Sequence, residues 1–121
     1  MFTIAVETRF SASHQITMAN GTREPLHRHD WIVTAEVSSE RLNEIGIVMD
    51  FVSLKKSMQR IVAPFQSASL ETLECFHRAN SSAENVAKYI YEQLMPLIPA
   101  GVKLESVSVV EEPLCRAKFR K

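Results

Sequence analysis

The chain has 121 residues, of which 45% are hydrophobic and 23% are charged. This composition is typical of a globular protein, and the length predicts a single domain over residues 1–121 with a buried core. The 14 Lys and Arg residues balance the 14 Asp and Glu residues. This neutrality argues against a nucleic acid or an anionic membrane surface as the partner.

The first residues read MFTIAVETRF and include Glu7 and Arg9, so they do not resemble a signal peptide. No apolar run approaches the roughly 20 residues that a membrane-spanning helix needs. Cys75 and Cys115 form neither a metal-binding pair nor a disulfide framework, and we expect them to be free, buried thiols. These features together predict a cytoplasmic protein.

The first part of the chain alternates between apolar and polar residues, as a half-buried strand does. This alternation predicts strands over Phe2–Phe10 and Trp31–Val37. The stretch from about Ser11 to Pro25 is polar and predicts a loop. After Gly46, the residues Ile47–Met49 predict a short strand-like segment that leads into Asp50 and is not one of the main strands.

Two amphipathic helices follow. Asp50 is the expected N-cap of the first, because its carboxylate can accept from the free amides of the next turn. Apolar residues then recur at helical spacing until Pro64 ends the helix. Ser81 and Glu84 have the spacing of a capping box and predict the start of a second helix, which ends near Pro96.

The remaining segments complete the predicted architecture. Gln66–Asn80 has no clear period and predicts a loop between the helices, whereas Val102–Glu111 and Cys115–Arg120 predict two further strands joined by a turn at Pro113. The order is strand, strand, helix, helix, strand, strand. Such grouping predicts an α+β fold with a four-stranded antiparallel sheet and both helices on one of its faces.

Three of the four histidines, His14, His27 and His29, lie close together in the sequence. Alternate residues of an extended segment point to the same side, so His27 and His29 would face one point. His14 follows the end of the first predicted strand, where a neighbouring strand would bring it alongside them. Three neutral imidazoles form an open zinc site with the fourth position left for water or substrate. The alternative is a group of ordinary surface histidines.

The histidines lie within a series of short motifs along the chain. These are FSASH (Phe10–His14), HRH (His27–His29), GIVMDFVSLK (Gly46–Lys55), SSAEN (Ser81–Asn85) and Glu111 within VVEE. They resemble the F-x-A-x-H, H-G-H, G-x-v-x-D-F-x-x-L-K and P-T-x-E-N motifs, and the strand-borne Glu, of the 6-pyruvoyltetrahydropterin synthase and 6-carboxytetrahydropterin synthase family. The motifs occur in the family's order and cover most of the chain.

The resemblance implies a subunit of the tunnelling fold (T-fold), whose sheets join edge to edge into a homotrimer that often stacks as a homohexamer. It also implies a Zn²⁺ ion held by His14, His27 and His29 at a subunit interface, where it binds the side-chain hydroxyls of a pterin substrate. Glu111 would accept two parallel N–H bonds from the guanidine-like edge of the pterin. The alternative for Glu111 is a solvated charge at a strand end.

Two catalytic groups of that family are missing here. Arg23 stands at the position of the usual Cys, four residues before His27, and the loop Pro64–Glu71 lacks the family's Asp-His pair. Glu24 resembles the Glu-for-Cys variant, which cleaves the side chain to 6-hydroxymethyldihydropterin. Its carboxylate would then be the base; otherwise it is an exposed loop residue that balances Arg23. His77 is a second candidate for the base.

The sequence therefore supports two functions. The first is a zinc-dependent pterin lyase that acts on 7,8-dihydroneopterin triphosphate. The second is a non-catalytic zinc- and pterin-binding paralogue that has lost the acid–base groups. A structural zinc protein is a third reading, but it would need a fourth protein ligand. Arg28, which replaces the Gly of H-G-H, should point away from the metal. The product, and its place in folate, queuosine or biopterin chemistry, stays open.

Overall fold

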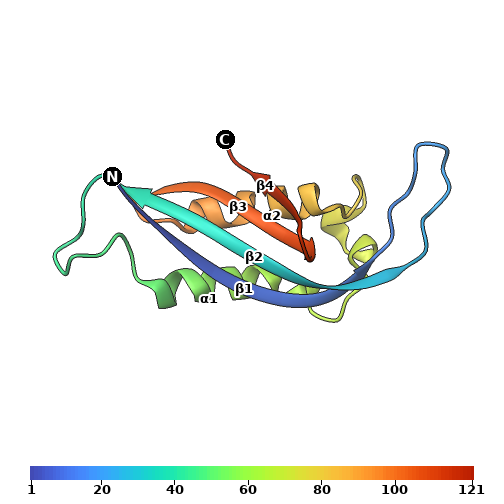
Figure 1. The fold of residues 1–121 in the computed structure, drawn as a ribbon, viewed down its shortest axis with the longest axis horizontal. Helices are drawn as coiled ribbons and strands as arrows, with labels where there is room; N and C mark the ends of the chain where they lie inside the picture. Colours follow the sequence, from blue (N-terminus) through green and yellow to red (C-terminus); the bar gives the residue numbers. More distant parts are fainter.

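A computed structural model describes all residues from 1 to 121 and contains a four-stranded antiparallel sheet and two α-helices (Figure 1). The strands are β1 (Phe2–His14), β2 (His27–Ser39), β3 (Lys103–Glu112) and β4 (Cys115–Phe119), and they lie in the order β1-β2-β3-β4. The helices are α1 (Phe51–Val62) and α2 (Ala83–Leu94). The predicted α+β fold with the order ββααββ is therefore confirmed.

Both helices cover the same face of the sheet (Figure 1). Helix α1 packs against β1, and helix α2 packs against β3 and β4. A single cluster of 23 buried apolar residues fills the space between the two layers. Because side chains alternate along a strand, Phe10 and Ala12 of β1 and Trp31 and Val33 of β2 face this core. None of the helices is both long and apolar enough to cross a lipid bilayer.

Strands β1 and β2 are longer than the sequence predicted. They pair without interruption from Phe2 opposite Ser39 to His14 opposite His27. The predicted loop from Ser11 to Pro25 is therefore partly wrong, because its first four residues belong to β1. The polar residues that suggested a loop alternate with Ala12 and His14, which are buried. His14 is the last residue of β1 and does not lie just past a strand.

The two helix caps differ in how well they were predicted. Asp50 caps α1 as expected, since its carboxylate accepts from the amides of Val52 and Ser53. The cap of α2 is Ser82, whose hydroxyl accepts from the amide of Asn85 at 3.2 Å. The prediction of Ser81 as the cap is wrong, because Ser81 is fully buried and its carbonyl faces a histidine of the site described below.

Two further predictions need correction. Ile47–Met49 forms no strand, because Asn43 holds the start of this segment in a turn through its contacts with Ile47. The cysteines are free but exposed, and not buried as predicted. Cys75 lies in a short 3₁₀ turn whose Phe76 enters the core in its place, and Cys115 lies on the edge strand β4.

Candidate metal centre

The register of β1 and β2 brings the three predicted histidines together. His14 lies directly opposite His27, and His29 lies opposite Ala12 on the same face of the hairpin. The imidazole centroids are 4.4 Å apart for His14 and His27, 5.2 Å for His14 and His29, and 4.5 Å for His27 and His29. The buried ring of Trp31 lies next to them and contacts His14 and His29 edge to face. The three histidines therefore lie on the face of the sheet that faces the core, at the end of the β1–β2 pairing.

Strand β3 adds a carboxylate to this group. Between Val110 and Glu112 the pairing of β3 with β4 shifts register, and such a bulge redirects the side chain at that position. The Oε1 atom of Glu111 lies 3.1 Å from His14 Nε2, 3.0 Å from His29 Nε2 and 3.7 Å from His27 Nε2. One ligand atom from each of the four residues lies within 4.8 Å of the others.

Backbone carbonyls orient two of the imidazoles. His14 Nδ1 lies 2.7 Å from the carbonyl oxygen of Ser81, and His27 Nδ1 lies 3.0 Å from that of Pro25. A carbonyl oxygen only accepts, so Nδ1 carries the hydrogen in both rings, and a neutral ring then presents the lone pair of Nε2 to the centre. Backbone carbonyls commonly orient metal-binding histidines in this way.

The four groups at the centre fit a cation. His29 Nε2 is buried without a hydrogen-bond partner, although Glu111 Oε1 is only 3.0 Å away. The Nε2 lone pairs of His14 and His27 face the same carboxylate oxygen, Oε1 of Glu111. Both ring nitrogens and this oxygen are hydrogen-bond acceptors, and no donor lies between them. In a four-coordinate site with metal–ligand bonds of roughly 2.0–2.2 Å, adjacent ligand atoms lie roughly 3.3 Å apart. The distances from Glu111 Oε1, 3.0–3.7 Å, span this value.

The electrostatics of His29 also favour metal binding. Burial lowers the pKa of His29 below its ordinary value; the Glu111 carboxylate opposes this shift, and the rings of His27 and His14 add to it. A lowered pKa favours the neutral imidazole near neutral pH, and a histidine must be neutral to bind a metal.

Glu24, the first candidate for the base, lies beside His27 but outside the four-residue cluster. Its Oε1 accepts from the amide of Ile16 at 3.2 Å and is 3.7 Å from His27 Nδ1. It is therefore next to the ring nitrogen that faces away from the centre. About a third of the Glu24 side chain, 32%, is exposed.

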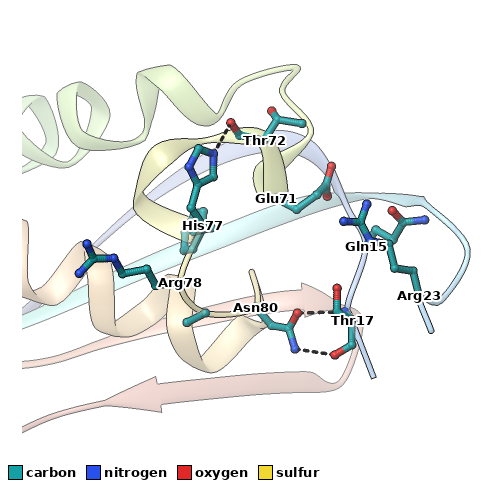
Figure 2. A pocket seen from close by; sticks show the side chains of 10 residues that line it. Gln15, Thr17, Arg23, Glu71, Thr72, His77, Arg78 and Asn80 are labelled. Atoms are coloured by element: carbon teal, nitrogen blue, oxygen red, sulfur yellow. Dashed lines mark hydrogen bonds between the residues drawn. The ribbon is translucent and has the colours of Figure 1, made fainter. Parts of the chain in front are cut away.

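His77, the second candidate, is not part of the cluster either. Its Nε2 lies 3.0 Å from the carbonyl oxygen of Thr72, at one side of a polar cavity of about 730 Å³ (Figure 2). Glu71 and Arg23 extend into the same cavity from different segments (Figure 2). The Oε1 atom of Glu71 is buried without a hydrogen-bond partner. The cavity is lined by Gln15, Thr17, Arg23, Glu71, Thr72, Phe76, His77, Arg78, Ala79 and Asn80.

Arg28 lies on the opposite side of β2 from the two neighbouring histidines. Its Nε donates to the hydroxyl of Ser11 at 2.9 Å, and its side chain is exposed. The expectation that Arg28 points away from the centre is therefore confirmed.

Several groups of the centre were not predicted in their observed positions. The carbonyls of Ser81 and Pro25 have no sequence signature, because every residue carries one. The sequence could have predicted in part that Glu111 approaches the histidines. Val107, Val109 and Glu111 are alternate residues of one strand, and the first two are buried, so Glu111 should share their side of the sheet. The bulge that redirects the Glu111 side chain could not be predicted from the sequence.

Comparison with known proteins identifies the family. Residues 3–121 match the family model described as 6-pyruvoyl tetrahydropterin synthase. A dihydroneopterin monophosphate aldolase of Pyrococcus furiosus is 30% identical over 108 residues, which cover 89% of this chain and 88% of the relative. The human 6-pyruvoyl tetrahydrobiopterin synthase is 36% identical over 87 residues, or 70% of this chain and 59% of the human protein.

A solved structure is similar over almost the whole chain. The 6-pyruvoyl tetrahydropterin synthase of Caenorhabditis elegans superposes with a TM-score of 0.87 and 23% identity, and the match covers 99% of this chain and 95% of that one. This chain therefore shares its fold with that structure. The match to the family model spans residues 3–121 and so includes all of the motifs named above. The chain belongs to the 6-pyruvoyl tetrahydropterin synthase family.

Proposed function

We propose that the chain is a zinc-dependent pterin lyase that acts on 7,8-dihydroneopterin triphosphate. The observation that carries this proposal is the convergence of three histidine nitrogens on one point, with the carboxylate of Glu111 among them. Three neutral imidazoles are a ligand set of catalytic zinc sites. A bound zinc ion would act as a Lewis acid and polarise the side-chain hydroxyls of the substrate.

The form of the reaction that we propose is cleavage of the side chain to 6-hydroxymethyldihydropterin. In this reaction a base takes the proton of the 2′-hydroxyl, the bond between C1′ and C2′ breaks, and C2′ leaves as an aldehyde that carries the phosphates. The electron pair left on C1′ then takes up a proton, so that no oxidant or water is consumed. The similarity to a relative that is named an aldolase supports this form.

Glu24 is the proposed base. It is the carboxylate closest to the histidines after Glu111, and the usual Cys position is occupied by Arg23. Its pairing with the amide of Ile16 fixes the carboxylate at the edge of the centre. The exposed part of its side chain leaves it accessible to a substrate. His77 is the alternative, but its Nε2 is engaged by the carbonyl of Thr72.

The pterin ring is recognised, in this proposal, by Glu111. A carboxylate accepts two parallel N–H bonds from a guanidine-like edge, and such charge-assisted pairs are stronger than neutral ones. One quarter of the Glu111 side chain, 25%, is exposed, so a ligand can reach it.

We also propose that the chain assembles into a homotrimer or a homohexamer. β1 and β4 lie at the two edges of the sheet. Apart from the bridge between Ser13 and Ser69 at the end of β1, their outer sides have no partner strand. Exposed strand edges tend to pair with another chain. Joining β1 of one subunit to β4 of the next would remove both edges.

A non-catalytic zinc- and pterin-binding paralogue is the second candidate. It is favoured by the positions of the two possible bases, because both Glu24 and His77 hydrogen-bond to the backbone and neither is in the cluster. Such a protein would bind neopterin without converting dihydroneopterin phosphates.

Product analysis by mass spectrometry separates the two candidates. The zinc-loaded protein is incubated with 7,8-dihydroneopterin triphosphate and, in a second reaction, with the monophosphate. The lyase proposal predicts 6-hydroxymethyldihydropterin and a phosphorylated aldehyde. Binding of neopterin without any product from either substrate would support the paralogue instead.

A further inference from the structure

The carboxylate of Glu111 lies among the histidine nitrogens and not beside them. Two parallel bonds to a pterin do not by themselves require the carboxylate to approach these nitrogens. Here Glu111 Oε1 is within 3.7 Å of all three Nε2 atoms. Apart from these histidines, its carboxylate has no hydrogen-bond or ion-pair partner.

We propose that in the resting protein Glu111 is the fourth ligand of the metal, so that the centre is closed until a pterin displaces the carboxylate. The identity of the displacing ligand rests on the proposed function, whereas the coordination by Glu111 does not. This role differs from that of a residue which only anchors the pterin, because it joins substrate recognition and metal coordination in one side chain.

A hydrogen bond between His14 and Glu111 does not account for the arrangement. The Nδ1 atom of His14 already donates to Ser81, so donation from Nε2 as well would require a doubly protonated ring. Even then, His29 Nε2 would remain buried without a partner. A proton thus satisfies one nitrogen of the group, whereas a cation satisfies all three nitrogens and the carboxylate at once.

The position of Glu111 in the sheet suits an exchangeable ligand. It lies at the bulge between Val110 and Glu112, beyond the last residue of β3 that pairs with β2. Its side chain is partly exposed and is held only by the three histidines. A pterin that offers two N–H groups to the carboxylate can therefore draw it away without breaking other contacts within the protein.

The chemical consequence is a change in the charge at the centre. Three neutral imidazoles and one carboxylate reduce the charge of a divalent ion to about +1, whereas three imidazoles alone leave it at +2. Loss of the carboxylate would free one coordination position and strengthen the polarising effect of the ion on a hydroxyl. The centre would become a stronger Lewis acid only when the pterin is bound.

Metal affinity and the visible spectrum of the Co²⁺-loaded protein test this inference. Zn²⁺ affinity is measured by competition with a chelator for the parent, Glu111→Gln and the control Glu112→Gln. Glu112 is the exposed neighbour outside the cluster. We expect Glu111→Gln to weaken zinc binding by at least about tenfold, since even groups that only support a ligand change metal affinity by 10–100-fold. Glu112→Gln should leave it unchanged.

The second readout uses the unmodified protein and so does not depend on the folding of a variant. Addition of neopterin to the Co²⁺-loaded parent should change the visible absorption, because one ligand of the ion is replaced. Equal zinc affinity for the parent and Glu111→Gln would overturn coordination by Glu111. A Co²⁺ spectrum that saturating neopterin leaves unchanged would overturn its displacement. Neither readout requires turnover, so an inactive protein would refute the proposed lyase function and leave this test intact.

Discussion

At the residue scale, two histidines of the centre each use one ring nitrogen to contact the backbone, and the other nitrogen faces the centre of the cluster. His14 donates to Ser81 at 2.7 Å, and His27 donates to Pro25 at 3.0 Å. Each contact fixes both the tautomer and the orientation of the ring. The lone pairs of the Nε2 atoms therefore point to the centre, so the fold itself orients these two rings for a cation.

Replacement of Glu24 tests the proposed base. Removal of the only general base commonly lowers the rate on the order of 10²- to 10⁴-fold. Glu24→Gln keeps the shape of the side chain but cannot take up the proton, so we expect a loss of product formation in this range. Zinc content and neopterin affinity should stay close to those of the parent. Rates are measured from the 6-hydroxymethyldihydropterin formed.

His77→Ala is the matched control for this experiment. His77 lies in the cavity of Figure 2 and outside the cluster, so its removal should leave most of the turnover. If Glu24→Gln retains activity and His77→Ala loses it, the base is His77 and our assignment of Glu24 is wrong.

The sequence predicted the histidines of the centre but only part of their surroundings. His27 and His29 were predictable because alternate residues of a strand share a face, and His14 because of its motif. The contact of Glu111 with the histidines depends on a register shift between Val110 and Glu112. No local sequence pattern predicts this shift. The carbonyl of Ser81 could not be predicted, because it reaches His14 through tertiary packing.

At the element scale, the β1–β2 hairpin carries the centre, and its length was underestimated. Ser11, Ser13, Arg28 and Asp30 are polar and suggested a loop. They lie on the face of the hairpin away from the core, where polar residues are compatible with a strand. Four more residues of β1 therefore pair with β2 and end at His14 opposite His27.

The start of α2 offers a test of local structure. Ser82 accepts from the amide of Asn85, so Ser82→Ala should lower the free energy of unfolding by about 1 kcal/mol. Ser81 was expected to be the cap, but its Oγ is buried without a hydrogen-bond partner. Ser81→Ala should therefore leave the free energy of unfolding unchanged or raise it.

Urea unfolding of both variants at one protein concentration gives these values. A fixed concentration is needed because the stability of an oligomer depends on it. A larger loss for Ser81→Ala than for Ser82→Ala would return the cap to Ser81 and contradict the structure of this helix end.

At the scale of the whole molecule, the helices cover one face of the sheet, and its two edges are open except where Ser13 at the end of β1 bridges to Ser69. The buried cluster of 23 apolar residues ends at the histidines on the core face. The order ββααββ and the single helical layer could be predicted from the hydrophobic periodicity. The order of the elements depends on whether each one is a strand or a helix, and not on the residues at which each one ends. The edge strands β1 and β4 are the surfaces through which we propose that the chains assemble.

The state of assembly is the prediction at this scale. Because β4 and most of β1 lack a partner strand on their outer sides, we expect three or six chains per particle. Light scattering coupled to size-exclusion chromatography measures the mass directly. A single monomeric species at micromolar concentration would contradict the proposed assembly and, with it, an active site shared between subunits.

The central claim is that His14, His27 and His29 hold one zinc ion. Elemental analysis of the protein purified without added metal tests it most directly. We predict about one zinc per chain, as for a three-histidine site, and a loss of most of this zinc in His27→Ala and in His29→Ala. His77→Ala, which removes the histidine outside the cluster, should keep the full amount. Zinc content that is unchanged in both His27→Ala and His29→Ala would contradict the account.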